Sequence, residues 1–351
     1  MSDKSGGKAS SGEKPSSPSP SSRSLSRELP VSLAQTCTCS TNTPRLALRI
    51  NKKPSSKRHH QSADDNNNMS KLSDPLKQLI NATHALPGYL KAPSSIRSTY
   101  SRVANSARDH GIGIPAWLTM ATATTMTMNS PGAMVELYHL TQSLPSPPPP
   151  AVTAGLMREV GLKCISFNGI PRTINCLGAF REGMPKDVFD SIPAQPSRQL
   201  EPDTLRDSIS RGRALWDSVY KPFEGKLLDK LAQSHPNLPV HIINGHYSNL
   251  LSDPPSDSPI KVGRVLTSLV AIACLRAQTG VGPQVTSHIF GLRKAYADGS
   301  AEKDIEGGEW LATDEGNQWI LNAIDEIVQG LTEGRGTTFA PGMGAKLQAK
   351  L

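Results

Sequence analysis

Prolines at the start of helix-forming segments constrain the fold of this chain more than any other feature. Such steps occur at Ile114-Pro115, Ser130-Pro131, Ile170-Pro171, Glu201-Pro202 and Gly282-Pro283. Proline is favoured at the first position of a helix because the N–H that it lacks has no intrahelical partner there. Together with helical spacing of apolar residues, this pattern predicts an all-α fold between about residues 70 and 332.

The individual segments differ in how much of their surface is apolar. Residues 261–278, KVGRVLTSLVAIACLRAQ, carry an apolar stripe broad enough for burial on most sides, and residues 314–331 carry a narrower one. Residues 202–234 form a charged helical stretch that Pro222 should break. HPNLPVHIING offers one short strand, although nothing supplies a partner sheet.

Both ends of the chain differ from its middle in composition. Residues 1–68 hold eleven Lys and Arg against five Asp and Glu, whereas the remainder holds 27 against 25. Low hydrophobicity with many Ser and Pro residues predicts a disordered tail over 1–68, a helical domain over 69–332 and a flexible tail over 333–351. Part of the first tail also suits a mitochondrial transit peptide. A natural protein start at Met69 is another interpretation.

Several classes of partner are not expected. The basic residues of the first tail lack interleaved aromatic residues, so we expect no nucleic-acid binding. No apolar stretch approaches the roughly 20 residues of a membrane-spanning helix. His241 and His246 are five residues apart and do not share a helical face, and the glycine turns fit no phosphate-loop pattern, so we expect neither a metal nor a cofactor.

The cysteines do not suggest a disulfide framework. Their number is odd, and Cys164, Cys176 and Cys274 lie among apolar residues. Buried cysteines usually behave as small hydrophobic residues, so we expect these three to be inert.

A weak internal repeat leads to a family resemblance. AWLTMATATTMTMNSPGAMVELYHL and VLTSLVAIACLRAQTGVGPQVTSHIFGL both read as helix, turn and helix, and aligning Pro131 with Pro283 places Glu136 opposite His288. Together with ISFNGIPRTIN, these runs resemble the alkylhydroperoxidase AhpD-like and carboxymuconolactone decarboxylase superfamily. Residues 70–332 are similar to a fungal branch of it, often described only as peroxisomal or mitochondrial.

The resemblance implies a helical bundle of two related hairpin halves and a homo-oligomer. Peroxidase members carry Cys-x-x-Cys-x-x-x-His, and counting back from His288 places the two cysteine positions at Val281 and Gln284. The position expected to hold an upstream acid is Leu269. Of the residues in this peroxidase motif, the chain keeps only the histidine and lacks both thiols. The resemblance therefore implies no thiol peroxidase chemistry.

Two functions remain open at this point. One is acid–base chemistry on a small organic acid or lactone, with His288, Glu136, Gln284 and Arg276 as the candidate catalytic residues. The other is a non-catalytic structural or adaptor role for the helical scaffold. The residues do not decide whether the protein is an enzyme.

The chain ends in Ala349-Lys350-Leu351. This tripeptide resembles the Ser-Lys-Leu signal that a soluble receptor reads at peroxisomes. It predicts a peroxisomal location and the import receptor as a partner, with the mitochondrion as the alternative location.

Overall fold

The computed structural model describes residues 72–255 and 260–337, and all of the following concerns these residues. In chain order the helices are α1 (Asp74–Ile80), the 3₁₀ turn η2 (Thr83–Ala85), α2 (Ile96–Asp109), α3 (Ile114–Thr127), α4 (Pro131–Gln142), α5 (Pro150–Lys163), α6 (Ile165–Asn168), α7 (Ile170–Gly183), α8 (Lys186–Asp190), α9 (Pro202–Tyr220), α10 (Glu224–Ser234), α11 (Asn237–His241), the π-helix η3 (Ile242–Leu251), α12 (Arg264–Gln278), α13 (Gly282–Ala297), α14 (Gly308–Leu311) and α15 (Asp314–Thr332).

The predicted all-α fold is confirmed, because no strand occurs in the part of the chain that the structure describes. The five prolines stand in the first turn of α3, α4, α7, α9 and α13. Pro222 lies between the end of α9 and the start of α10, where it was expected to break the helix. Local backbone chemistry therefore determines where these helices begin and end.

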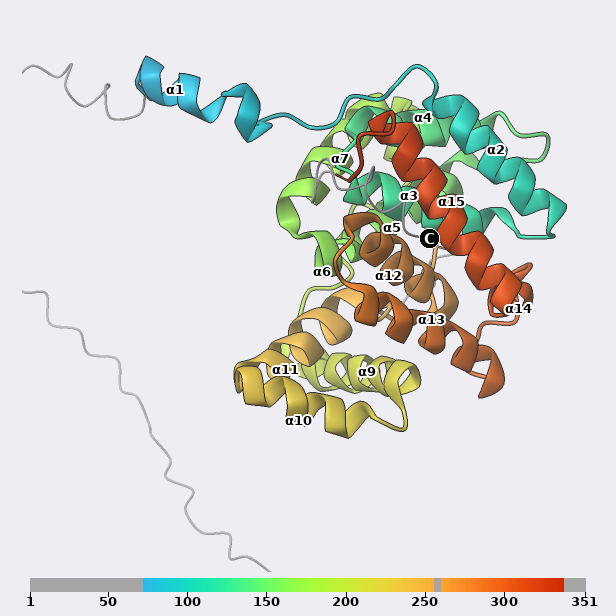
Figure 1. Cartoon of the computed structure of the whole chain (residues 1–351). Coiled ribbons are helices and arrows are strands. Elements are labelled where there is room, and N and C mark those ends of the chain that lie inside the picture. The colour runs from blue at the N-terminus through green and yellow to red at the C-terminus, as the bar shows by residue number, and fades with distance from the viewer. Residues whose placement is uncertain (1–71, 256–259, 338–351) are drawn as a thin grey trace, which may run out of the picture. The chain divides into compact units, whose positions relative to one another are not determined.

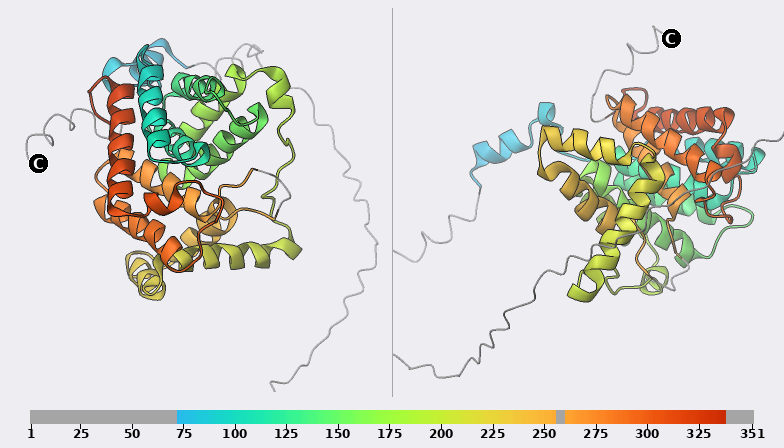
Figure 2. Two further views of the ribbon diagram at one scale, coloured as in Figure 1. Left: turned by 90° about the vertical axis from the view of Figure 1, so that its right-hand side faces the viewer. Right: turned by 90° about the horizontal axis from the view of Figure 1, so that it is seen from below.

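Helix α12 forms the centre of the main core. Almost every residue from Arg264 to Ala277 is buried, and the helix packs against α3 on one side and α13 on another. Figures 1 and 2 show α15 running beside α2 and across α3, which closes the core. The carboxylate of Glu302 accepts hydrogen bonds from the backbone N–H groups of Arg264 and Val265, so the buried start of α12 has partners.

A smaller core joins α9 to the π-helix η3. Trp216, Ile243, Tyr247 and Leu251 are its buried members. The two helices approach closely at Gly212, where an added Cβ would lie 2.3 Å from the Cα of Ser248. Only glycine fits this contact. The partner helix η3 is a π-helix, and π-helical turns often occur at functional sites.

The strand considered for HPNLPVHIING is wrong. These residues form α11 and the start of η3 instead. A strand needs a neighbour for its N–H and C=O groups, and none is present among the described residues, whereas a helix satisfies these groups locally.

Two sequence-based expectations fall outside these ranges. The tail over 1–68 and the tripeptide Ala349-Lys350-Leu351 lie outside the described residues. In the described ranges, no helix has both the length and the apolar composition needed to cross a bilayer.

Candidate functional site

His288 lies on α13 inside an aromatic cluster. It is 7% exposed, and the rings of Tyr220 and Phe167 lie 6.0 and 6.1 Å from its own. The Tyr247 hydroxyl donates to the Tyr220 hydroxyl at 3.2 Å, and the Tyr220 hydroxyl lies 3.4 Å from His288 Nε2. A chain of three titratable groups therefore leads from η3 through α9 to α13.

The protonation of this cluster follows from burial and from one cation. Burial, and secondarily the charge of Arg264, lower the pKa of His288 to about 4. The Arg264 guanidinium donates to the carbonyl of Gly291 at 2.7 Å, which fixes it close to α13. Burial also raises the pKa of the Tyr220 hydroxyl. At neutral pH the imidazole is thus uncharged and can accept a proton or a hydrogen bond.

The structure does not gather the four candidate residues at one point. Gln284 is exposed at the start of α13, one turn before His288. Arg276 forms a two-point ion pair with Asp325 of α15, with a closest N–O distance of 2.6 Å. Glu136 of α4 pairs with Arg97 of α2 at 3.7 Å. Gln284 is therefore the only one of these three placed within a helical turn of His288.

Cys164, Cys176 and Cys274 are buried, as expected. Cys164, between α5 and α6, and Cys274 of α12 bring their sulfur atoms to 3.6 Å, which their sequence separation did not suggest. Burial raises the pKa of the Cys164 thiol well above its usual range and that of Cys176 to about 12. Both thiols are protonated at neutral pH, and a protonated thiol is a poor nucleophile.

A second polar cluster surrounds Lys163, at the end of α5. Its ammonium is fully buried and donates to the carbonyls of Leu251 and Val262 at 2.6 and 2.9 Å and to the Thr267 hydroxyl at 3.0 Å. It also forms an ion pair with Asp253 at 2.7 Å. Burial lowers the pKa of Lys163, and the charge of Asp253 opposes this. The lysine thereby fixes both ends of the 251–262 segment to α5.

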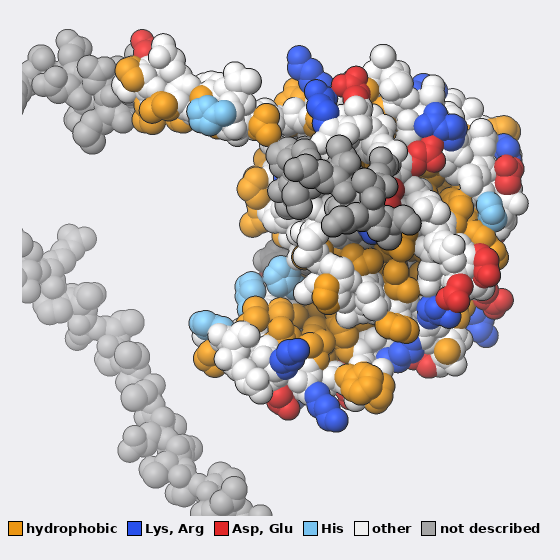
Figure 3. Space-filling view, in the orientation of Figure 1, with side chains coloured by type: hydrophobic (Ala, Val, Ile, Leu, Met, Phe, Trp, Pro, Cys, Tyr) orange, Lys and Arg blue, Asp and Glu red, His pale blue; other side chains and the backbone are white. Residues whose placement is uncertain are grey.

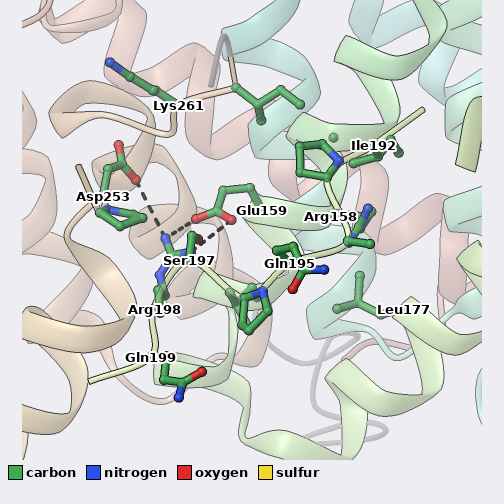
Figure 4. Close-up of a pocket in the computed structure, with 17 residues that line it drawn as sticks. Arg158, Glu159, Leu177, Ile192, Gln195, Ser197, Arg198, Gln199, Asp253 and Lys261 are labelled. Atoms are coloured by element: carbon green, nitrogen blue, oxygen red, sulfur yellow. Dashed lines mark hydrogen bonds and ion pairs between the residues drawn. The ribbon is translucent and has the colours of Figure 1, made fainter. Parts of the chain in front are cut away.

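This cluster continues into the wall of a cavity of about 700 Å³ (Figure 4). Arg198 lies between two carboxylates: it pairs with Glu159 through both terminal nitrogens and lies 3.9 Å from Asp253. The remaining wall is mainly apolar, with Leu162, Leu177, Ile192, Ile260 and the prolines of the 193–196 segment. A concave, largely apolar site with a few fixed charges is the usual form of a small-molecule pocket.

Arg158 is an arginine of this wall that forms no ion pair with a carboxylate among the described residues. Its guanidinium stacks on the Phe189 ring at 5.3 Å, and none of its N–H groups has a hydrogen-bond acceptor among the described residues. Burial lowers its pKa, while the neighbouring Glu159 acts in the opposite direction. Arg158, Arg198 and Lys261 outnumber Glu159 and Asp253, so the lining has a positive surplus.

A smaller cavity of about 260 Å³ adjoins the first one and shares Ser197, Arg198, Gln199 and Pro254 with it. Its other side is formed by α9 and the end of η3 and is rich in hydroxyl groups. Arg198 therefore stands between the two cavities. His288 lines neither of them, and no cluster of metal-binding side chains occurs in the described ranges.

Comparison of the chain with protein-family models, with curated proteins and with solved structures gave no match.

Sequence reasoning missed the Lys163 and Arg198 clusters. Lys163 ends a helix and reads as a surface lysine, and Arg198 and Asp253 lie in irregular segments with no motif. The one available signal was the position of Lys163 within GLKCIS, where its neighbours Leu162, Cys164 and Ile165 are apolar.

Proposed function

We propose that this protein binds a small organic acid in the cavity beside Arg158 and Arg198. The observation that carries the proposal is the Arg158 guanidinium, which lines a largely apolar cavity and whose N–H groups have no hydrogen-bond acceptor among the described residues. A guanidinium presents parallel N–H groups that match the two oxygens of a carboxylate. The volume of about 700 Å³ lies within the range of small-molecule pockets.

The first prediction tests this with hexanoate and its uncharged analogue hexanol. If the dissociation constant is about 1 mM, hexanoate at about 10 mM adds about 1.4 kcal/mol to the free energy of unfolding. This raises Tm by about 3 °C, as measured by differential scanning fluorimetry. Hexanol should give a smaller shift because it lacks the carboxylate that Arg158 would bind.

The chain offers a matched control for Arg158. Arg181 also lies 5.3 Å from the Phe189 ring centroid but is not part of the cavity wall. Arg158→Met should abolish the hexanoate shift, and Arg181→Met should preserve it. Equal shifts with hexanol and hexanoate, or a full hexanoate shift in Arg158→Met, would contradict the proposal.

Acid–base catalysis at His288 is a second candidate function. The specific observation that favours it is the hydrogen-bonded chain from Tyr247 through Tyr220 to His288. Tyr220 is half-buried, so it is the member of the chain that a substrate could reach. This candidate requires an uncharged His288 at neutral pH, which the pH dependence of unfolding tests.

Membership of the AhpD-like superfamily remains part of the proposal. It is supported by the all-helical fold and by two helical hairpins, α3–α4 and α12–α13, whose second helices carry Pro131 and Pro283 in their first turns. An experimental structure in which these hairpins superpose on each other would test the idea of two related halves.

The second prediction concerns location. We expect a fluorescent protein fused to the N-terminus to show peroxisomal puncta, because the receptor reads the free carboxylate and last side chains of Ala349-Lys350-Leu351. Deleting this tripeptide, or fusing the fluorescent protein to the C-terminus, should make the signal diffuse. Mitochondrial labelling, or puncta that survive the deletion, would instead favour the N-terminal segment as the targeting signal.

A further inference from the structure

Two histidines, His241 and His246, lie next to each other where α11 meets η3. Their ring centroids are 5.1 Å apart, and the rings are almost perpendicular at 85°. His241 is the last residue of α11 and is exposed, whereas His246, within η3, is half-buried. Figure 3 shows histidine side chains at the surface beside the region of α10 and α11. The pair is therefore accessible to a ligand from solution.

The π-helical winding of η3 brings the two rings together. Residues five apart do not share a face of an α-helix, and that spacing is the reason why the sequence suggests no metal at this pair. In a π-helix the backbone hydrogen bonds join residues five apart, so side chains at this spacing lie over each other. The spacing argument therefore does not hold for this segment.

Both rings have a nitrogen atom available to a ligand. Nδ1 of His246 forms a hydrogen bond with the Ser166 hydroxyl at 3.0 Å, and its Nε2 has no partner among the described residues. Neither ring nitrogen of His241 has such a partner there. Gly245 leaves space beside the His241 ring, because an added Cβ would lie 3.3 Å from its Nδ1. Histidines that bind metals usually have their other ring nitrogen held in this way by a second group.

The geometry and the charge of the pair both suit a metal ion. With metal–nitrogen bonds of about 2.0–2.1 Å, two imidazoles on one tetrahedral Zn²⁺ have ring centres about 5 Å apart. The observed 5.1 Å agrees with this distance. Burial, and secondarily the charge of His241, lower the pKa of His246, so its ring is uncharged at neutral pH. Only the uncharged imidazole binds a metal.

We propose that His241 and His246 together bind one divalent transition-metal ion of the zinc class. Imidazole nitrogen is a good ligand for Zn²⁺, Cu²⁺ and Ni²⁺, whereas Mg²⁺ and Ca²⁺ prefer oxygen. Two protein ligands leave the remaining coordination positions to water or to a bound molecule, as in an open metal site. Neither histidine lines the two cavities, so this site is independent of the organic-acid cavity.

The third prediction tests the site by isothermal titration of the untagged full chain with Zn²⁺ near neutral pH. The wild-type protein should bind Zn²⁺ at this pair. His241→Gln and His246→Gln should each weaken that binding about 10-fold or more, because each removes one of the two ligands. Ser166→Ala should weaken it by a smaller factor, since both ligands remain and only the orientation of His246 is lost.

Two matched controls use other histidines of the chain. His235→Gln alters a neighbouring exposed histidine, whose Nδ1 accepts a hydrogen bond from the Asn237 N–H at 3.1 Å, and should leave Zn²⁺ binding unchanged. His59→Gln combined with His60→Gln removes the adjacent pair of the N-terminal segment and should also leave the affinity at this site unchanged. Far-ultraviolet circular dichroism checks that each variant is folded.

Proton NMR of the imidazole groups gives a second measurement that does not depend on affinity. Zn²⁺ should shift the ring resonances of His241 and His246 and leave those of the buried His288 in place. The proposal is overturned if the wild-type protein binds no Zn²⁺, if His241→Gln and His246→Gln both keep the full affinity, or if binding is lost with the two N-terminal histidines instead.

Discussion

We expect Lys163→Met to be the most destabilising single substitution tested, with a loss of about 3–5 kcal/mol in the free energy of unfolding. Methionine has a similar length but cannot donate to the carbonyls of Leu251 and Val262. It also leaves the Asp253 carboxylate without the ammonium that lies 2.7 Å from it. A loss of this size corresponds to a fall of about 10 °C in Tm, measurable by urea titration and calorimetry.

Lys77→Met is the appropriate control for this fourth prediction. Lys77 also pairs with an aspartate, at 3.0 Å, but both side chains are exposed, and such pairs contribute about 0–1 kcal/mol. Adding Asp253→Asn to Lys163→Met should restore part of the stability, because it removes the stranded negative charge. If Lys163→Met and Lys77→Met cost the same, the ammonium does not hold the 251–262 segment as described.

The fold was predictable from local features of the sequence. The prolines at 115, 131, 171, 202 and 283 act through their own backbone, so their effect does not depend on distant residues. Residues 264–278 carry apolar side chains on most sides of the helix, so the sequence alone predicted that this helix would be buried. Helix α12 is indeed the central helix of the core. The prediction of a strand within residues 235–245 was wrong because a short apolar run with β-branched residues is compatible with either a strand or a helix.

The candidate site was much less predictable, because its residues meet through tertiary packing. Lys163, Arg198 and Asp253 come from a helix end and two irregular segments, and no spacing rule connects them. For Arg276 the partner proved to be Asp325, on a helix whose packing angle the sequence does not specify. The position of His288 in a helix was predictable, but the hydroxyl beside it belongs to Tyr220, 68 residues away.

The fifth prediction is that acid destabilises the wild-type protein more than a variant without His288. The folded state holds this imidazole at a pKa of about 4, whereas an unfolded chain has the ordinary value of about 6.5. Between these values the unfolded state binds more protons, so the free energy of unfolding falls as pH decreases. Between neutral pH and pH 4, the titration of His288 therefore lowers the free energy of unfolding by about 3 kcal/mol.

The measurement compares urea unfolding at pH 7 and pH 4 for wild type and His288→Gln. Glutamine keeps a polar group near Tyr220 but does not titrate, so the variant should lose about 3 kcal/mol less on acidification. His139→Gln, which removes an exposed imidazole, should behave like wild type. The difference arises because protonation places an imidazolium beside the Arg264 guanidinium in a buried site, where both desolvation and like-charge repulsion oppose it. If His288→Gln loses as much stability as wild type, His288 is not held neutral, and the hydrogen-bonded chain from Tyr247 cannot supply a general base at neutral pH.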